Sequence, residues 1–530
     1  MSESAIPQRV PHARALFFRR LRVAAAICGF LCAALWKPAG AADPAVSCEV
    51  AKNRNSAVFA SCLHKSHGRF AKTRSAARLS DDLQRCEEKL SNSWRRAESK
   101  AAGACPTIGD EARLLSGIRA NADCVASALA TGDASCLRGA ATSSAEEALN
   151  RFISAFMGSA EFIKSHPFYD SPQDRAEGIR RLLRTTAHAI QDGFDDKDFP
   201  VFSRRPDHLI RGALDNPDNT YYQARIHDDR DYRITGTRGT TASLVFQSLK
   251  GYPGVGTSGP SDGIDILDQA DMIIEPDGTF EIIVSRDPQP GNWLRIEEGA
   301  ETIIVRYSHS DWDTEEAGTV HITQLGYEGS STPEFDESRM AEVLDRASLV
   351  LTDTIEFWPG LVEAAFTIFP PHYPLGPLLT RNGLDTQYYV ASNYELADDE
   401  ALIITAHPSA AEYQGIQLGE YWFESFEYAH RQTSLTTAQA DLGSDGVYRF
   451  VVTKNDPGVA NWLDTEGHPK GLIFMRWQGL EPVPEAVTMH VVPFSEIQAQ
   501  YPPDVPILTP EERRQAIAAR QAHIQRRYDQ

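Results

Sequence analysis

The pattern of hydrophobic and polar positions changes from helical to strand-like along the chain. Residues 80–102 are rich in Ala, Arg, Lys, Glu and Leu and lack β-branched runs, which favours a helix. Apolar residues at helical spacing indicate three amphipathic helices further on, and a polar helix is expected at the end of the chain. These four segments are 144–163, 174–192, 337–357 and 510–528.

Short β-branched and aromatic runs separated by turn residues predict strands between about residues 221 and 492. Three clear examples are the runs 242–249, 280–285 and 302–307, which are bounded by Gly251, Gly278 and Gly291. The helix expected over 337–357 divides this β region into two parts.

The two parts of the β region repeat one another. Five short segments recur in the same order at offsets of 167 to 170 residues, which indicates a duplication. This period exceeds the 20–50 residues of solenoids and propellers, so each copy is expected to be a β-sandwich or jelly-roll-like unit. The paired segments are 219–222 with 386–389, 269–271 with 439–441, 277–280 with 445–448, 287–294 with 456–463, and 303–307 with 473–477.

The N-terminus has the pattern of a secretory signal peptide. An apolar run of 14 residues, 23–36, follows several arginines and precedes small residues, which predicts cleavage after Ala41. The run is shorter than the ~20 residues that span a bilayer, and no later run reaches that length. We therefore expect an exported protein, periplasmic or secreted, with no membrane span in the mature chain. The arginines are Arg14, Arg19, Arg20 and Arg22.

Six cysteines cluster in the predicted helical region that follows. An even, clustered set in an exported chain predicts three disulfides, and sequence leaves the pairing open. Zinc is less favoured because no Cys-x-x-Cys pair is present. The stretch from Cys86 through Trp94 to Cys105 loosely resembles cysteine-bearing helical modules of secreted bacterial proteins, a resemblance that implies no activity. The cysteines are Cys48, Cys62, Cys86, Cys105, Cys124 and Cys136.

The expected fold is therefore mainly β with helical additions: a disulfide-stapled helical module followed by two related β units. The predicted organisation is a signal peptide (1–41), the cysteine-rich module (42–140), connecting helices (141–200), a first β unit (201–330), a linking helix and Pro-rich loop (331–380), a second β unit (381–497) and a C-terminal helix (498–530).

The net charge of −21 over 530 residues argues against nucleic acid as a partner, because such binding needs a basic face. A small-molecule or glycan ligand is the expected partner, and the sequence does not decide the oligomeric state.

Residues shared by the two copies resemble a known family. Asp277-Gly278, Asn292-Trp293-Leu294 and Arg306-Tyr307 are similar to the core of the bacterial "domain of unknown function twelve-fourteen" family. The second copy matches through Asn461-Trp462-Leu463 and Arg476-Trp477, although both copies lack the proline usual after the Asn-Trp-Leu motif. The resemblance implies a β-rich, exported protein and supplies no reaction.

Six residues of the first copy are candidates for ligand binding. Trp293 beside Asn292 and Arg306 suits stacking on a sugar, whereas the structural alternative has the Trp closing the sandwich and the Asn tying down the loop. Residues kept in both copies are more often scaffold than specificity determinants. Arg233 and Arg238 have no counterpart in the second copy and suit an anionic ligand, unless nearby aspartates pair with them. The set is Tyr222, Arg233, Arg238, Asn292, Trp293 and Arg306.

Catalysis would require paired carboxylates, for which the candidates are Asp271, Glu420 and Glu424. Strand alternation would place Glu420 and Glu424 on one face together with Trp422, although solubility of an edge strand explains that pattern equally well. No nucleotide-binding or zinc-protease motif is present. We expect no cofactor or metal. The alternative is Ca²⁺ at Asp262, Asp265 and Asp268, where a solvated acidic loop is favoured.

The leading functional hypothesis is an exported binding protein for a carbohydrate or another envelope-derived ligand, including an anionic one. A carbohydrate-active hydrolase or lyase that uses paired carboxylates is the alternative. A non-catalytic interaction protein of the envelope is the third.

Overall fold

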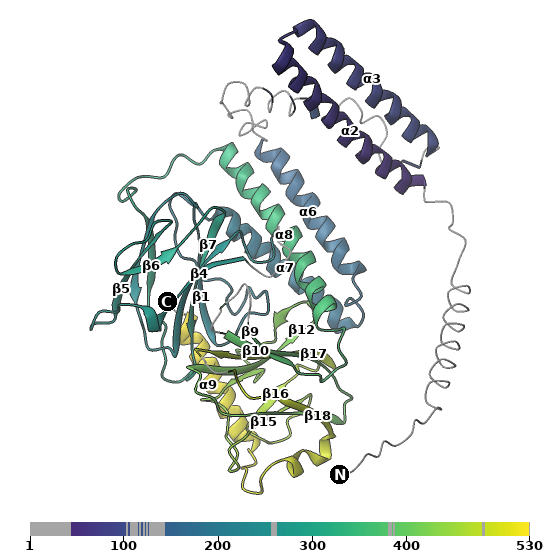
Figure 1. The fold of residues 1–530 in the computed structure, drawn as a ribbon. Helices are drawn as coiled ribbons and strands as arrows, with labels where there is room; N and C mark the ends of the chain where they lie inside the picture. The colour runs from purple at the N-terminus through teal and green to yellow at the C-terminus, as the bar shows by residue number, and fades with distance from the viewer. Residues whose placement is uncertain are drawn as a thin grey trace, which may run out of the picture. The chain divides into compact units, whose positions relative to one another are not determined.

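The computed structural model divides the chain into two compact units, Met1–Thr142 and Ser143–Gln530 (Figure 1). Each is described by itself, the second being called the body. The predicted signal peptide lies outside the described residues. These are 44–101, single positions between 104 and 126, 144–255, 262–379, Leu384, 387–479 and 483–528.

In the N-terminal unit, α2 (Pro44–Thr73) and α3 (Ala76–Lys100) lie side by side (Figure 1). The disulfide Cys62–Cys86 joins the two helices, and Cys48 is bonded to Cys105. The helices bury a small core that includes Trp94 and Leu63. The predicted disulfide-linked helical module is thus confirmed, while Cys124 and Cys136 lie outside the described residues. No helix in the described part of the chain is both long and apolar enough to cross a membrane.

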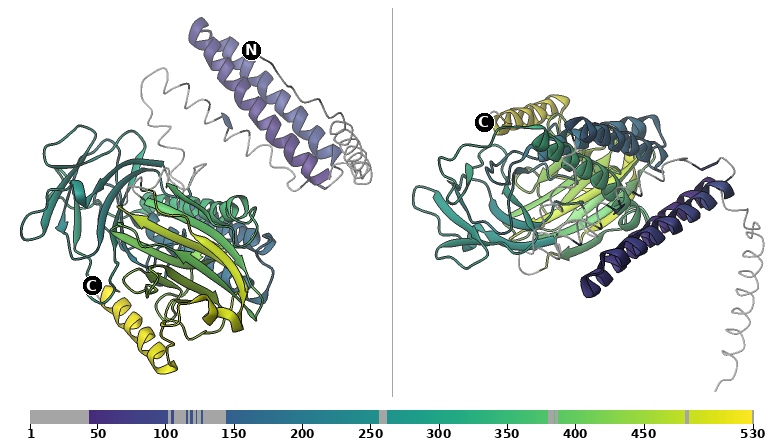
Figure 2. Two further views of the ribbon diagram at one scale, coloured as in Figure 1. Left: turned by 60° about the horizontal axis from the view of Figure 1, so that its bottom comes forward. Right: turned by 90° about the horizontal axis from the view of Figure 1, so that it is seen from above.

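The body begins with α6 (Ala145–Ser165) and α7 (Pro172–Phe194), which pack with α8 (Glu337–Ala365) as a helical layer beside the strands (Figure 2). Capping boxes start the first two helices: Ser144 with Glu147 and Ser171 with Asp174. Helix α8 continues beyond the predicted end at residue 357, and Pro359 lies within it.

Helix α7 buries only part of the apolar stripe that helical spacing predicts. Leu182 is buried, whereas Ile179 and Leu183 are 48% and 56% exposed. The buried side also carries Arg181 and Gly178, and a Cβ at Gly178 would meet Trp422 at 2.8 Å. The helix therefore turns polar side chains toward the strands, where ion pairs hold them.

The first β unit is a sandwich of two four-stranded sheets with the orders β1-β7-β3-β4 and β6-β5-β2-β8. The core between them contains residues such as Ile303, Val305 and Tyr307. The elements are β1 (Asn219–Arg225), β2 (Tyr232–Thr237), β3 (Ser243–Lys250), β4 (Asp262–Asp268), the 3₁₀ helix η1 (Gln269–Asp271), β5 (Thr279–Ser285), β6 (Asn292–Arg295), β7 (Ala300–Ser308) and β8 (Val320–Gln324).

The second β unit repeats this arrangement. Its sheets contain β10-β17-β12 and β16-β15-β11-β18, including a parallel β15–β16 pair that matches β5–β6. The prediction of two related sandwich-like units is confirmed. The elements are β9 (Leu375–Leu379), β10 (Gln387–Glu395), β11 (Glu400–Ala406), β12 (Tyr413–Glu420), β13 (Glu424–Ser425), β14 (Ser434–Thr436), β15 (Tyr448–Thr453), β16 (Trp462–Asp464), β17 (Lys470–Gln478), β18 (Thr488–Pro493) and the 3₁₀ helix η2 (Phe494–Gln500).

Strand register corrects one segment of the repeat. Tyr221 lies opposite Arg306, and Tyr389 lies opposite Arg476. Tyr221 therefore corresponds to Tyr389, an offset of 168, whereas the sequence alignment pairs it with Tyr388. The difference matters because a shift of one residue moves a strand's side chains to the opposite face.

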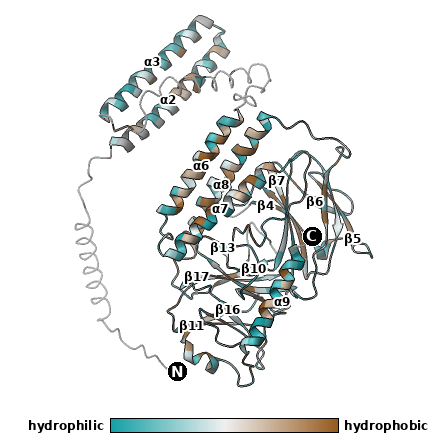
Figure 3. Cartoon of the chain, turned by 180° about the vertical axis from the view of Figure 1, so that it is seen from behind, coloured by the Kyte–Doolittle hydropathy of each residue, from teal (hydrophilic) through white to brown (hydrophobic). Residues whose placement is uncertain are grey.

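The final helix, α9 (Pro510–Tyr528), carries many hydrophilic residues (Figure 3) and contacts both β units. Arg527 donates to the carbonyl of Pro217 beside the first unit, and Arg513 donates to Asp456 in the second. Arg520 and Arg527 both lie over the ring of Trp312. The helix thus links the two units largely through arginines, and Ile524 adds an apolar contact in a cluster with Trp312 and Tyr428.

Candidate functional site: a cavity between the two β units

A cavity of about 420 Å³ lies where the two β units and the helical layer meet. Strands β1 and β7 supply one wall, and β10 and β17 supply another. Helices α7 and α8 and the loop 211–216 complete it. We call it the inter-unit cavity. Its volume falls within the usual range for small-molecule sites.

Strand alternation explains which side chains reach this cavity. On β7, Ile303, Val305 and Tyr307 face the sandwich core, while Ile304 and Arg306 line the cavity. The corresponding residues of β17 behave the same way, so that Phe474 and Arg476 line the cavity. The duplication therefore brings two equivalent arginines to one space.

The two arginines are held in the same manner. Arg306 Nη1 donates to Gln247 Oε1 at 2.8 Å, and Arg476 Nη1 donates to Gln417 Oε1. Arg476 also donates to the carbonyl of Leu214 at 3.1 Å. Among the described residues, no carboxylate forms an ion pair with either guanidinium, although the cavity lining includes the carboxyl group of Asp215. Burial lowers the pKa of Arg306, because the charge sits largely out of water.

Two tyrosine hydroxyls accompany the arginines. The backbone N–H of Asn216 donates to the Tyr221 hydroxyl at 3.1 Å. Burial raises the pKa of Tyr221, and the charges of Arg306 and Arg476 both oppose that rise, so both arginines act on this one hydroxyl. Burial also raises the pKa of Tyr389. Both phenols therefore remain protonated hydrogen-bond donors at neutral pH.

Much of the remaining wall is aromatic. Trp358 stacks on Phe423 with ring centres 5.1 Å apart and an interplanar angle of 12°, and Phe366 stacks on the same ring at 6.2 Å. Phe474 meets Phe366 edge-on at 5.3 Å. These side chains give the cavity an apolar portion next to its cationic one.

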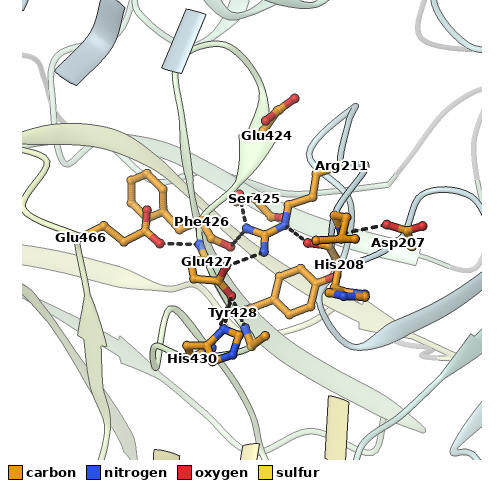
Figure 4. Close-up of polar contacts among 12 residues, drawn as sticks. Asp207, His208, Arg211, Glu424, Ser425, Phe426, Glu427, Tyr428, His430 and Glu466 are labelled. Carbon is orange, nitrogen blue, oxygen red and sulfur yellow. Dashed lines mark hydrogen bonds and ion pairs between the residues drawn. The ribbon is translucent and has the colours of Figure 1, made fainter. Parts of the chain in front are cut away.

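Arg211 also lines the cavity, but its guanidinium is already bound to other groups of the protein (Figure 4). It donates to the carbonyls of Ser425 and Phe426 and pairs with Glu427 at 3.1 Å. Arg181, on α7, pairs in turn with Glu424 at 3.5 Å. These two arginines are therefore committed to the protein, which distinguishes them from Arg306 and Arg476.

The structure does not bring the six predicted ligand residues together. Arg306 alone lines the inter-unit cavity. Tyr222 points to the opposite face of β1, where it meets Tyr307 edge-on at 6.2 Å. The proposal of a single site formed by all six residues is therefore withdrawn.

Asn292 and Trp293 hold a loop. The Asn292 side chain accepts from the N–H of Ile273 at 2.6 Å and donates to its carbonyl at 2.8 Å. Asn461 makes the same pair of bonds with Asp441. Trp293 donates to the carbonyl of Ser285 at 3.2 Å. The asparagine contacts match the structural alternative given above, whereas Trp293 is half-buried and lies outside the sandwich core, which the next residue, Leu294, enters instead.

The two arginines unique to the first copy lie on its outer surface or within a loop. Arg233 is partly exposed and pairs with Glu281 at 3.4 Å and Glu328 at 4.0 Å, not with the nearby aspartates. Arg238 donates to the hydroxyl and carbonyl of Thr241. Neither lines the inter-unit cavity.

The predicted catalytic carboxylates occupy unexpected places. Glu420 and Glu424 do not share one strand, because β12 ends at Glu420 and a turn through Phe423, with φ +65°, leads to β13. They lie opposite one another as partners in that hairpin, and both are buried. Asp271 is exposed in η1. The strand expected over 420–424 was wrong because the left-handed turn residue is a phenylalanine and gives no turn signal.

Two of the three aspartates considered for Ca²⁺ have separate partners. Asp265 accepts from the backbone N–H of Arg295 at 2.8 Å, and Asp268 caps η1 through the N–H of Ala270. Asp262 is exposed on β4. Asp265 and Asp268 are therefore used locally.

Sequence reasoning missed most of the cavity. Gln247 and Gln417 were not singled out, although the offset of 170 that pairs Arg306 with Arg476 also pairs these glutamines. That shared offset was the available signal. No comparable signal indicated the aromatic wall that α8 contributes, because in the sequence Trp358 is indistinguishable from an ordinary core residue.

No family model and no curated protein matches the chain. A crystal structure of an uncharacterized protein from Burkholderia cenocepacia is similar, with 31% identity, a TM-score of 0.61, and coverage of 66% of this chain and 98% of that one. The VPA0106 protein from Vibrio parahaemolyticus shares 12% identity, with a TM-score of 0.35 and coverage of 59% of this chain and 100% of that one. On the first of these similarities, the chain belongs to the same family as the uncharacterized Burkholderia cenocepacia protein.

Proposed function

We propose that the protein binds a small organic anion with an apolar portion in the inter-unit cavity. The carrying observation is that Arg306 and Arg476, equivalent residues of the two copies, line one cavity and have no carboxylate partner among the described residues. Removing such charges from water is costly unless an anion compensates for them. A ligand carboxylate, sulfonate or phosphate would supply that compensation, and guanidinium donors suit these groups.

The apolar wall narrows the ligand class. A carbohydrate needs many polar partners around its ring, whereas Trp358, Phe366 and Phe474 offer apolar surface. An amphipathic acid, with its head group at the arginines and its hydrocarbon on the aromatic rings, fits both parts of the cavity. This modifies the leading hypothesis from carbohydrate toward the anionic, envelope-derived alternative. Export and membership of the twelve-fourteen family remain part of the proposal and rest on the sequence patterns.

The hydrolase alternative has less support. Glu424 is fully buried and is paired with Arg181 and with Arg184, the latter at 2.6 Å. Neither Glu420 nor Glu424 lines the inter-unit cavity. Paired carboxylates that act on a sugar must reach the substrate.

Calorimetric titration tests the proposal. The purified chain is titrated with octanoate, decanoate and dodecanoate and with the three corresponding alcohols. We expect the acids to bind more tightly than the alcohols, and Arg306→Gln combined with Arg476→Gln to remove that preference. Arg233→Gln is the matched control, because Arg233 lies on the surface.

Equal affinity for acids and alcohols would contradict the proposal, as would failure of all six compounds to bind. An acid preference that the double variant retains would place the anion elsewhere and would contradict it as well. Circular dichroism of the double variant establishes that it is folded.

A further inference from the structure

We propose that Glu177, Glu466 and His468 form a binding site for a divalent transition-metal ion inside the body. Glu177 lies on α7, and the other two lie between β16 and β17. One ligand atom from each residue lies within 4.8 Å of the others. This site is separate from the inter-unit cavity, whose lining includes none of the three.

His468 is buried and directed into this cluster. It is 3% exposed, and its Nε2 has no hydrogen-bond partner. The same nitrogen lies 3.7 Å from Glu177 Oε1. The imidazole stacks on Phe426 with ring centres 4.8 Å apart, which fixes its orientation. An imidazole nitrogen held in this way, next to carboxylates and without a hydrogen bond, is available as a metal ligand.

Neighbouring groups of the protein hold both carboxylates in place. Glu177 Oε2 pairs with Arg180, which leaves Oε1 facing His468. Glu466 Oε1 accepts from the backbone N–H of Glu427 at 2.5 Å, and Figure 4 shows these two residues side by side. These outer contacts orient the ligands, as is usual around metal sites.

Further buried acidic groups surround the three residues. Glu424 is compensated by its own two arginines. Glu177, Glu420 and Glu466 are largely buried, Arg180 pairs with Glu177, and the charges of Arg180 and Arg211 both act on Glu466. Glu420 Oε1 also has no hydrogen-bond partner. Buried acidic groups are normally paired or coordinate metals, so a cation suits this part of the body.

The ligand types indicate the metal class. One imidazole nitrogen with two carboxylate oxygens suits Zn²⁺, Mn²⁺ or Fe²⁺ better than Ca²⁺, which prefers oxygen alone. The site would fasten α7 to the second β unit. It revises the sequence expectation that the protein has no metal.

Zinc binding tests the site. The chain, without a histidine tag, is treated with EDTA, dialysed and titrated calorimetrically with Zn²⁺, with Ca²⁺ for comparison. We expect one equivalent of Zn²⁺ to bind more tightly than Ca²⁺ and to raise the thermal unfolding midpoint. His468→Gln and Glu466→Gln should each weaken Zn²⁺ binding at least tenfold.

His407→Gln is the matched control, because His407 also lies near a glutamate, Glu485 at 3.6 Å, but on the surface. Absence of Zn²⁺ binding to the native chain would overturn the inference. Equal Zn²⁺ affinity in the native chain and the Glu466→Gln variant would also overturn it. If circular dichroism shows that His468→Gln does not fold, Glu466→Gln alone decides.

Discussion

The two β units have the same strand order but meet the helical layer differently. At the start of β7 the first unit carries Glu301, which pairs with Arg225 at 2.9 Å and with Arg346 of α8 at 3.2 Å. The second unit has Gly471 at the position 170 residues later, where a Cβ would meet the Tyr394 ring at 2.7 Å. At this position, ion pairs therefore join the first copy to the helical layer. In the second copy, close packing of side chains takes their place.

The two copies also differ in the hydrogen bonds that α7 makes just beyond β3 and β12. Tyr252 and Trp422 each follow their strand by two residues, and α7 contacts both. Tyr252 hydrogen-bonds His188, whereas Trp422 donates to the carbonyl of Asp174 at 3.0 Å. Duplicated strands thus keep their pairing and diverge where they contact parts of the chain that occur once.

Residues shared by both copies have two different roles. Asn292 and Asn461 hold loops, as expected of scaffold positions. Arg306 and Arg476 are equally shared and line the inter-unit cavity. A residue that is present in both copies can therefore be either structural or part of the cavity, because the cavity lies between the copies.

The largest expected effect comes from the two equivalent tryptophans. Trp462 is 8% exposed, packs in an apolar cluster and lies beneath Arg513, whereas Trp293 is half-buried. Trp462→Ala should lower the free energy of unfolding by about 3–5 kcal/mol, and Trp293→Ala by clearly less. Urea unfolding followed by circular dichroism measures both, and equal losses would mean that the copies bury this position alike.

The loop asparagines should behave alike. Asn292→Ala and Asn461→Ala each remove two hydrogen bonds to a partly buried loop backbone, which costs about 1–3 kcal/mol. Urea unfolding of the two variants should give losses of similar size, somewhat larger for Asn292, which also donates to the carbonyl of Glu281 at 2.9 Å. A loss in one copy only would show that the shared contact is not equivalent.

Single arginine variants distinguish the copies in binding. Arg476 makes one more hydrogen bond to the protein than Arg306 does, because it also donates to the Leu214 carbonyl. Arg306→Gln should therefore weaken decanoate binding more, by about tenfold, or about 1.4 kcal/mol. Arg476→Gln should have a smaller effect in the same calorimetric titration. The reverse order would place the acid head group nearer the second copy.

The smallest effect concerns His188, whose pKa burial lowers to about 3, with further lowering by Arg205. Below its ordinary pKa near 6.5 the unfolded chain takes up a proton that the folded chain does not. The free energy of unfolding should therefore fall, relative to His188→Gln, by about 1 kcal/mol between pH 6.5 and pH 5.5. His523, with a pKa lowered by burial to about 3, should behave the same way. Parallel stability curves for the native and variant chains would contradict this.

Local patterns predicted the elements whose causes are local. The helix expected over 510–528 forms over Pro510–Tyr528, and the strand expected over 280–285 falls within β5. The turn after Glu420 was missed, because the residue with positive φ is Phe423. The apolar stripe expected on α7 is buried only in part, at Leu182, because ion pairs and the close approach at Gly178 leave Ile179 and Leu183 outside.

The sequence by itself determined the duplicated β architecture and the disulfide-linked helical start, because alternation, turn residues and repeated motifs act over short distances. Arg306 was also among the ligand-binding residues predicted from the sequence. Only the tertiary structure decided that Arg306 faces Arg476 across a cavity and that Glu177 meets His468, residues 291 positions apart. Contacts between residues so far apart in the sequence depend on how the two β units and the three helices pack together, and the whole chain determines that packing.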